Sequence, residues 1–169
     1  MIKFRQEEPD DQLAIRHVNE QGFDTSEEAD LVDALREANA IVLSMVALDN
    51  DCIIAHVLFT EVVVTQADSQ FTALGLGPMA VLPSHQRKGI GTQLLQIALD
   101  KYRHLDYDFV VVLGYPEFYS RFGFSTAKPH GIRCEFDAPD EAFMVLELRE
   151  NALAGRSGIV HYRDEFRNV

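Results

Sequence analysis

Residues 74–102 read LGLGPMAVLPSHQRKGIGTQLLQIALDKY, and this stretch decides the fold. The apolar run up to Val81 predicts a strand. Within it Pro78 lacks an amide donor, which favours a bulge or an edge position. The chain turns at a second proline, and two glycines, Gly89 and Gly91, then open a helix. The stretch therefore predicts one strand, one glycine-bearing loop and one helix, which the rest of the chain is built to hold.

The loop has the features of an anion site. The first amides of a helix have no partner inside the helix, and the aligned peptide dipoles make that end electropositive. Gly89 and Gly91 allow the backbone to approach a ligand closely, and Arg87 and Lys88 add positive charge. These features suit a pyrophosphate. The alternative is an ordinary strand-to-helix turn with basic residues facing solvent.

A nucleotide signature in the same stretch is a false lead. Gly75, Gly77 and Ala80 satisfy the spacing G-x-G-x-x-A of a dinucleotide fingerprint. That fingerprint needs a helix that opens within the motif, whereas these residues lie inside a strand that continues to Val81. The chain also lacks the G-x-x-x-x-G-K-[ST] pattern of phosphate-binding loops. Neither signature explains the loop.

Length and composition predict a single globular domain over residues 1–169. Hydrophobic residues make up 47% of the chain and charged residues 25%, which is typical of globular proteins. The formal net charge of −12 argues against general nucleic-acid binding and mildly favours cationic or amine substrates. Solubility is the more general explanation of that charge.

The cysteines and the hydropathy pattern indicate a location and exclude some site classes. Cys52 and Cys134 are too few and too widely spaced for a disulfide framework or a zinc site. No apolar run reaches the length of a signal-peptide core or a membrane span. We therefore expect a cytoplasmic protein with neither a membrane partner nor a metal.

Periodicity and capping signals outline the other elements. Thr25-Ser26-Glu27-Glu28 has the spacing of a capping box, and Gly22 is the expected end of the helix before it. In the first half of the chain we expect a strand at 2–5, a helix at about 10–22, a second helix from the capping box to residue 38, a hairpin of strands 41–48 and 52–64, and a loop at 65–70. In the second half we expect a buried parallel strand at 109–113, a short helix at 117–122, a strand at 143–148 and an edge strand at 159–162.

A second motif follows the predicted parallel strand. Tyr119, Gly123 and Phe124 form a Tyr-x-x-x-Gly-Phe segment. Together with Gln86-Arg87-Lys88-Gly89-Ile90-Gly91, this order resembles the GNAT superfamily of N-acetyltransferases over most of the chain, and residues 113–124 resemble its bacterial YhbS-type branch. The resemblance implies an α/β fold with layered helices. Its central sheet would be mixed, mostly antiparallel and of about six or seven strands, splayed at the coenzyme site, with helices on both faces.

The resemblance also implies a coenzyme and its binding residues. Acetyl-CoA would be the acetyl donor. The loop would hold its pyrophosphate, and the backbone of Met79 and Val81 would pair with the pantetheine arm. Amides of the same strand are candidates for holding the developing oxyanion. The residues assigned to the coenzyme are Met79, Ala80, Val81, Gln86, Arg87, Lys88, Gly89, Ile90, Gly91, Thr92, Gly114, Phe118 and Phe122.

Acetyl transfer to an amine requires an acid and a base. A thiol titrates near ~8.5 and a tyrosine near ~10, so a placed phenol can stabilise or protonate the departing thiolate. Tyr119 occupies the family's position for this role; its alternative is a core aromatic. The base must deprotonate an amine, and Glu61, His56 and water are the candidates. An edge carboxylate and a hydrogen-bonded core histidine are the alternatives for the first two, and His85 more plausibly flanks phosphate.

One departure from the wider family stands next to the tyrosine. Many members have an asparagine at the end of the second cofactor strand, where this chain has Gly114-Tyr115-Pro116, as the YhbS-type branch also does. The expected function is acetyl transfer to a primary amine by direct attack, and a covalent route through Cys52 or Cys134 is the weaker mechanism. The alternative is a non-catalytic acyl-CoA-binding sensor or interaction module. The acceptor, the acyl length and the choice between monomer and homodimer stay open.

Overall fold

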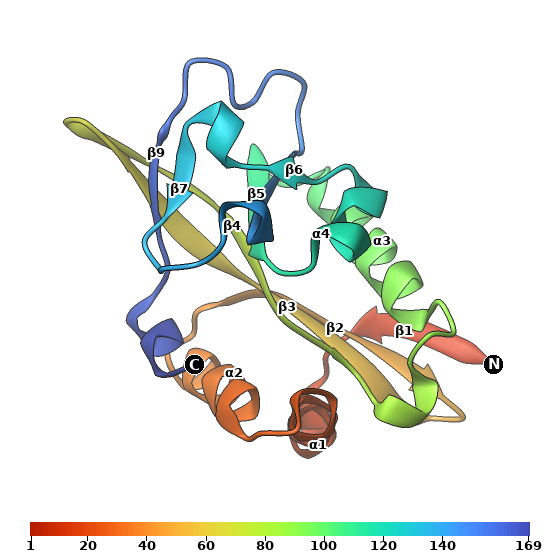
Figure 1. Ribbon diagram of the computed structural model, residues 1–169. Coiled ribbons are helices and arrows are strands. Elements are labelled where there is room, and N and C mark those ends of the chain that lie inside the picture. Colours follow the sequence, from red (N-terminus) through yellow and green to blue (C-terminus); the bar gives the residue numbers. More distant parts are fainter. The chain divides into compact units, whose positions relative to one another are not determined.

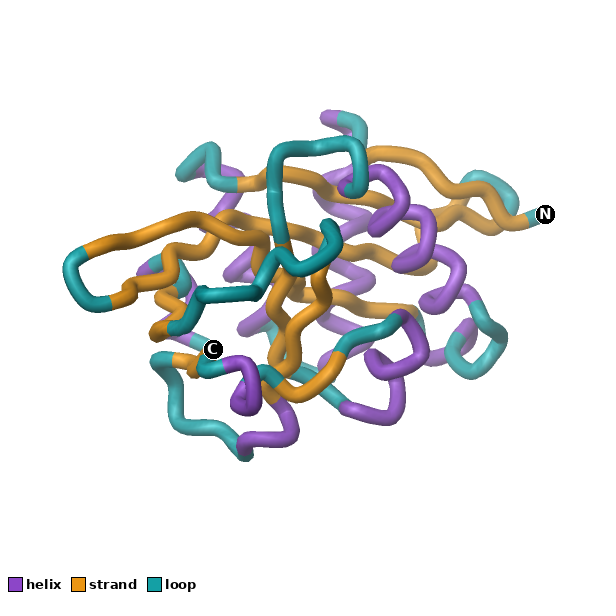
Figure 2. The backbone as a smooth tube through the Cα atoms, turned by 90° about the horizontal axis from the view of Figure 1, so that it is seen from above, coloured by secondary structure: helices purple, strands orange, loops and turns teal.

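The computed structural model describes residues 1–169, which form nine strands and four α-helices (Figures 1 and 2). The strands are β1 (Ile2–Gln6), β2 (Ile41–Asp49), β3 (Cys52–Gln66), β4 (Ser69–Val81), β5 (Phe109–Leu113), β6 (Ser125–Thr126), β7 (Ile132–Cys134), β8 (Phe143–Glu147) and β9 (Gly158–His161). The helices are α1 (Gln12–Phe23), α2 (Glu27–Glu37), α3 (Ile90–Tyr102) and α4 (Pro116–Tyr119).

The strands form a mixed, mostly antiparallel sheet, which confirms the predicted fold class. Their order is β1-β2-β3-β4-β5-β8-β6, and β9 pairs with both β3 and β7. The β4–β5 and β7–β9 pairs are parallel, whereas β1–β2, β2–β3, β3–β9, β5–β8 and β6–β8 are antiparallel. The sheet has more strands than expected because β6 and β7 span only two and three residues, too few for an alternating pattern to show.

The residues group into two compact units that share three elements. One unit contains residues 1–60, 77–100 and 164–169, and the other contains residues 61–76 and 101–163. Strands β3 and β4 and helix α3 each contribute to both. The single domain over residues 1–169 stays a prediction.

In the first unit, helices α1 and α2 pack their apolar sides on strands β2 and β3. The shared core contains Ile15, Leu31, Val32, Leu35, Val46, Leu48 and Leu58. Figure 1 shows the two helices beside each other below these strands. Met45 and Val57 pair across the two strands, and their side chains point to the face opposite to these helices. Both are also buried, so this part of the sheet is covered on both faces.

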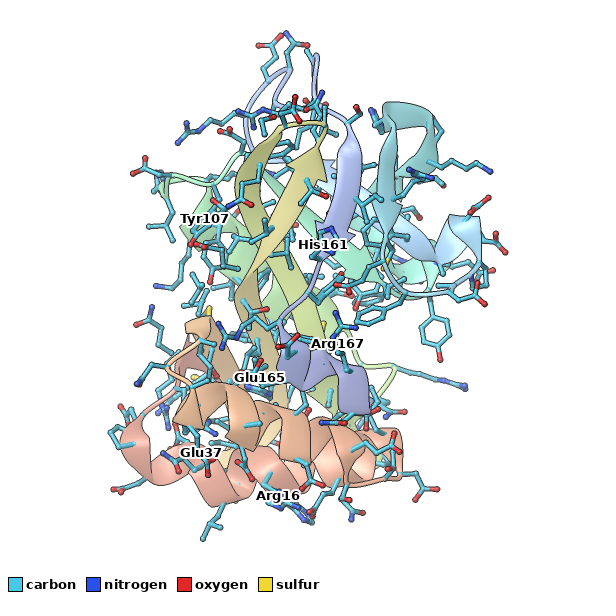
Figure 3. The ribbon with its side chains drawn as sticks, turned by 90° about the vertical axis from the view of Figure 1, so that its left-hand side faces the viewer. Arg16, Glu37, Tyr107, His161, Glu165 and Arg167 are labelled. Atoms are coloured by element: carbon cyan, nitrogen blue, oxygen red, sulfur yellow. The ribbon has the colours of Figure 1, made fainter.

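An arginine ties the two helices together on their outer side. Arg16 of α1 pairs with Glu20 on its own helix at 2.9 Å, and with Asp30 and Asp33 of α2 at 2.8 and 2.7 Å (Figure 3). These ion pairs are largely solvent-exposed and individually weak. Three carboxylates around one guanidinium nevertheless specify how the polar faces of α1 and α2 meet.

The structure corrects two local expectations in the first half of the chain. Helix α1 does not end at Gly22: it continues to Phe23, and Asp24 closes it in the left-handed conformation with φ +57°. The predicted loop at 65–70 is much shorter, because strands β3 and β4 extend into it and leave only a turn in which Ala67 has φ +49°. Polar side chains mislead there because the end of β3 is only partly buried and the start of β4 is exposed to solvent.

In the second unit, β5 lies between β4 and β8. Its parallel pairing with β4 runs from Leu74–Val110 to Leu76–Val112, and on its other edge it pairs with β8 over its whole length. The predicted final strand is present as β9, which pairs with two neighbours rather than lying at an edge. None of the helices is both long and apolar enough to cross a lipid bilayer.

Candidate functional site

The glycine loop has the geometry expected of an anion site. Arg87 and Gly89 both adopt positive φ, at +62° and +79°, and helix α3 begins immediately afterwards. The first helical hydrogen bond runs from the Gln93 amide to the Gly89 carbonyl at 3.1 Å, so the amides before Gln93 lie at the open end of the helix. Arg87 and Lys88 are exposed and form no ion pair. Two free cations therefore accompany a row of unpaired helical amides.

The loop is anchored to the strand before it. The Gln86 side-chain amide donates to the Val81 carbonyl at 2.9 Å, and the Leu82 amide donates to the carbonyl of Ile54 on β3 at 2.9 Å. The backbone of strand β4 is irregular a few residues before Val81, where Gly77 has φ +139° and the peptide bond from Gly77 to Pro78 is cis. The irregularity that Pro78 predicts thus lies directly after the last residue that pairs with β5.

Strand β4 is also in close contact with helix α1. A Cβ on Gly22 would lie 2.9 Å from the Ala80 Cβ and 3.4 Å from the Val81 carbonyl oxygen. Ala80 is buried, whereas Met79 and Val81 are partly exposed. The strand therefore presents one face to α1 and keeps the side chains on either side of Ala80 accessible.

In the other unit, Gly114 makes room for the ring of Tyr119. A Cβ on Gly114 would lie 2.9 Å from Tyr119 Cδ2 and would collide with Cε2. The predicted departure from the wider family therefore has a steric reason, because a side chain at position 114 would occupy the volume of this ring. A glycine at the end of β5 and a tyrosine on α4 form one structural feature.

Tyr119 lies in an aromatic cluster and is nearly buried. Its ring meets those of Phe118 and Phe124 edge-on, at centroid distances of 5.0 and 5.7 Å, and Phe118 also meets Phe122 at 5.3 Å. Burial raises the pKa of Tyr119 to about 12, with a smaller contribution from the nearby phenol of Tyr115. The phenol is therefore neutral and able to donate a hydrogen bond throughout the physiological pH range.

Glu61 is exposed and has a partner that the sequence does not indicate. The Tyr107 hydroxyl donates a hydrogen bond to Glu61 Oε2 at 2.8 Å (Figure 3). Burial and then this carboxylate raise the pKa of Tyr107 to about 12. Tyr107 stands in the segment between α3 and β5, 46 residues from Glu61, and no local pattern links the two. One carboxylate oxygen is thus engaged and the other can still accept a proton.

His56 is a buried core histidine with both ring nitrogens engaged. Its Nδ1 lies 3.1 Å from the Asn19 amide nitrogen and its Nε2 lies 2.9 Å from Ser44 Oγ. Burial, with a smaller effect of the Arg36 charge, lowers the pKa of His56 to about 3. A histidine in this environment has no lone pair available to an acceptor amine, so the geometry supports the core alternative.

His85 and the two cysteines have local roles. His85 Nε2 lies 3.2 Å from Asp49 Oδ2 and its Nδ1 lies 2.9 Å from Ser84 Oγ, so the ring is held at the base of the loop. Cys52 is exposed, and burial raises the pKa of Cys134, which makes its thiolate less accessible. Neither cysteine has a histidine among its hydrogen-bond partners.

The candidate residues thus form two sets. The first contains the loop, the Met79–Val81 strand and the helix end at Gly22; the second contains Gly114, Tyr119 with its aromatic neighbours, and the Glu61–Tyr107 pair. No group of three or more histidine, cysteine, aspartate or glutamate side chains is placed to hold a metal ion.

Comparison with known proteins shows the family. A model of the acetyltransferase (GNAT) domain matches residues 3–127. The chain belongs to this family. Among curated relatives, it is 37% identical over 164 residues to the uncharacterized N-acetyltransferase YhbS of Escherichia coli K12, covering 96% of this chain and 97% of the relative. The resemblance that the motifs indicated is confirmed.

Two solved structures of the GNAT family show the same architecture. The crystal structure of E. coli YhbS in complex with CoA aligns with a TM-score of 0.92 at 35% identity, over 98% of this chain and 92% of that one. A GNAT acetyltransferase from Brucella melitensis in complex with acetyl-CoA aligns with a TM-score of 0.80 at 31% identity, over 98% of both chains. The GNAT fold therefore extends over nearly all of this chain.

The buried state of His56 predicts a pH dependence of stability. Its pKa is lowered on folding, so the stability that its neutral form contributes is present above about pH 6.5 and is lost as pH falls toward 3. Between pH 7 and 5.5 the wild type should lose about 1 kcal/mol more unfolding free energy than His56→Gln. Urea denaturation at both pH values measures this difference. Equal losses in the two proteins would contradict a neutral buried His56.

Proposed function

We propose that this chain is an acetyl-CoA-dependent N-acetyltransferase that transfers the acetyl group to a primary amine by direct attack. The observation that carries the proposal is the loop after β4, in which unpaired helical amides and the free cations Arg87 and Lys88 form an anion site within a GNAT fold. The relatives in complex with CoA and acetyl-CoA support the choice of coenzyme.

The residues of the loop fit the charged part of this coenzyme. The backbone amides from Gly89 to Thr92 would bind the pyrophosphate oxygens, with Arg87 and Lys88 adding charge and Gln86 holding the loop on Val81. Met79 and Val81 would offer backbone groups to the pantetheine arm. In the other unit, Gly114, Phe118 and Phe122 would complete the coenzyme contacts.

The coenzyme supplies an acetyl thioester, and the chain's residues handle charge and protons. The attacking amine forms the new C–N bond as the C–S bond breaks, and the sulfur leaves with its electron pair. Amides of the Met79–Val81 strand would hold the negative charge that develops on the carbonyl oxygen. Tyr119 would donate its phenolic hydrogen bond, and then its proton, to the departing sulfur.

The properties of Tyr119 suit this role. A free thiol titrates near ~8.5, so a phenol with a pKa of about 12 is the weaker acid, and it donates a hydrogen bond before it yields its proton. Burial disfavours the charged thiolate as it disfavours the charged phenolate, so the difference between the pKa values of the thiol and the phenol is smaller within the site. The proton that the amine loses goes to Glu61 or to water, and the net result is one acetamide and one thiol.

A non-catalytic acyl-CoA-binding module is the second candidate. It would keep the loop and dispense with the base, and the exposed position of Glu61, with one oxygen held by Tyr107, favours it. Both candidates bind coenzyme A. Turnover with an amine panel, followed as free thiol, separates them.

Of three predictions that follow from the proposed function, the first concerns the loop. Gly91→Asp places a carboxylate where the pyrophosphate would bind, and should weaken CoA binding at least about tenfold with the fold intact. Gly89→Glu should have the same effect. Gln96→Glu adds the same charge to an exposed site further along α3 and serves as the control. Isothermal titration calorimetry measures the affinity, and an unchanged value in both loop variants would refute the pyrophosphate assignment.

A second prediction couples Gly114 to Tyr119. Tyr119→Phe removes the phenol and should lower kcat about 100-fold. Gly114→Ala displaces the ring and should lower kcat in a similar way. Because both changes act through one hydroxyl, the double variant should be no slower than Tyr119→Phe.

The control for this pair is Tyr115→Phe, which removes an exposed phenol from the same loop. Its kcat should stay within about twofold of the wild type. Multiplying effects in the Gly114→Ala/Tyr119→Phe variant would show that the two residues act independently. Unchanged turnover in Tyr119→Phe would exclude Tyr119 as the acid.

A third prediction tests the base. If Glu61 accepts the amine proton, Glu61→Gln should lower kcat at least about tenfold with CoA affinity unchanged. Tyr107→Phe, which releases the bound oxygen, should then also change kcat. Glu150→Gln is an exposed control. Wild-type rates in Glu61→Gln would assign the base role to water.

A further inference from the structure

Gly22 stands at a point where helix α1 touches the proposed coenzyme strand. Glycine destabilises a helix interior relative to alanine, so its presence in the last turn of α1 needs another reason. The contact supplies it: a Cβ at this position would lie 2.9 Å from the Ala80 Cβ, closer than two carbon atoms pack. The helix gives up propensity at Gly22 to approach β4 closely.

One turn earlier, a polar network holds the same helix on the sheet. The Asn19 side-chain nitrogen contacts the Ile15 carbonyl at 3.0 Å and His56 Nδ1 at 3.1 Å, and His56 Nε2 contacts Ser44 Oγ at 2.9 Å. All three side chains of the network are buried. It therefore joins α1 to β3 through His56 and to β2 through Ser44.

The donors in this network can be assigned. The Asn19 nitrogen has only hydrogens to offer, as its contact with the Ile15 carbonyl requires, so His56 Nδ1 must accept. The ring proton is then on Nε2, which donates to Ser44 Oγ. The neutral ring keeps this arrangement across the physiological pH range. Because the donor and acceptor of each hydrogen bond are fixed, the network fixes the distance of α1 from β2 and β3.

The contact between α1 and Ala80 affects the position of the backbone groups of the adjacent residues Met79 and Val81. Side chains alternate along a strand, so Ala80 faces α1 while Met79 and Val81 face away. Peptide units are rigid, so a shift at Ala80 moves the amides and carbonyls on either side of it. The Val81 carbonyl is also within 3.4 Å of a Cβ at position 22, and it accepts the Gln86 side chain that anchors the loop.

We propose that Gly22 and Asn19 are positioning residues, which set the height of the Met79–Val81 strand by holding the end of α1 against Ala80. This rests on the proposed function, in which that strand binds the coenzyme. The helix end would act as a fixed support behind the strand, and the polar network would prevent α1 from sliding. The strand then keeps its backbone groups in place before the coenzyme arrives.

The test is a pair of compensating substitutions. Gly22→Ala adds one methyl group and should raise the KM for acetyl-CoA and the Kd for CoA about tenfold. The melting temperature should change by only a few degrees, because the gain in helix propensity partly offsets the cost of moving α1 and Ala80 apart. Gly22→Ala/Ala80→Gly removes the opposing methyl group and should recover most of that loss. Gln21→Ala, an exposed change in the same turn, should behave as the wild type.

A second variant tests the network. Asn19→Asp replaces the donating nitrogen with an acceptor, so His56 must donate from Nδ1, by reversing its tautomer or by taking up a second proton, or lose the bond. The imidazole nitrogen shifts should change in NMR spectra, and CoA affinity should fall with KM rising more than kcat falls. Wild-type affinity in a variant whose His56 signals have changed would remove Asn19 from the positioning role.

The outcomes separate this proposal from the proposed function. If the wild type binds no CoA, the proposed function fails. If the wild type binds CoA and Gly22→Ala binds equally well with the same KM, the positioning role fails and the function stands. Should Gly22→Ala not fold, the wild type alone decides: saturation with CoA should shift the Gly22 amide signal, and an unmoved signal would overturn the proposal.

Discussion

Strand β4 belongs to two environments, and the rest of the structure depends on how it changes between them. Leu74 to Leu76 pair in parallel with β5, and this pairing ends at Leu76. Directly afterwards Gly77 takes a positive φ, and three residues later Ala80 is pressed against Gly22 of α1. The pairing with β5 and the contact with α1 therefore fall on two successive segments of β4, and Gly77 and Pro78 lie between them.

Two glycines outside the loop, Gly22 and Gly114, each allow a neighbouring group to approach closely because they have no side chain. Gly22 lets a helix approach a strand, and Gly114 lets the ring of Tyr119 lie over the end of β5. In both cases the absence of a glycine side chain determines where the adjacent residue can lie, which is Ala80 beside Gly22 and Tyr119 beside Gly114. At both positions even the methyl group of alanine would come too close to a packed atom, the Ala80 Cβ beside Gly22 and the Tyr119 ring beside Gly114, so a neighbour would have to shift.

Much of the fold could be predicted because the long elements have strong local signals. The branched residues of β3, the capping pattern before α2 and the glycine loop before α3 each identified their element, and β5 matched its predicted bounds. The short strands β6 and β7 could not be predicted, since two or three residues carry no period. At 65–70 a polar composition suggested a loop, where the structure continues both strands as an exposed hairpin end.

The candidate site divides in the same way. The loop residues are neighbours in sequence, and local chemistry suffices to indicate an anion site around Arg87 and Gly89. The partners of Glu61 and His56 come from positions 46 and 37 residues away, and nothing in their local sequence indicates Tyr107 or Asn19.

By itself, the sequence determined the long elements and their order, the position of the glycine loop and the resemblance to the family, because these depend on contiguous patterns of hydrophobicity, glycine and charge. Only the tertiary structure decided that His56 is a neutral core residue, that Gly22 lies against Ala80 and that Gly114 accommodates a tyrosine ring. The reason is physical: burial, donor direction and steric room are properties of atoms brought together from distant positions, and they exist only once the chain has folded.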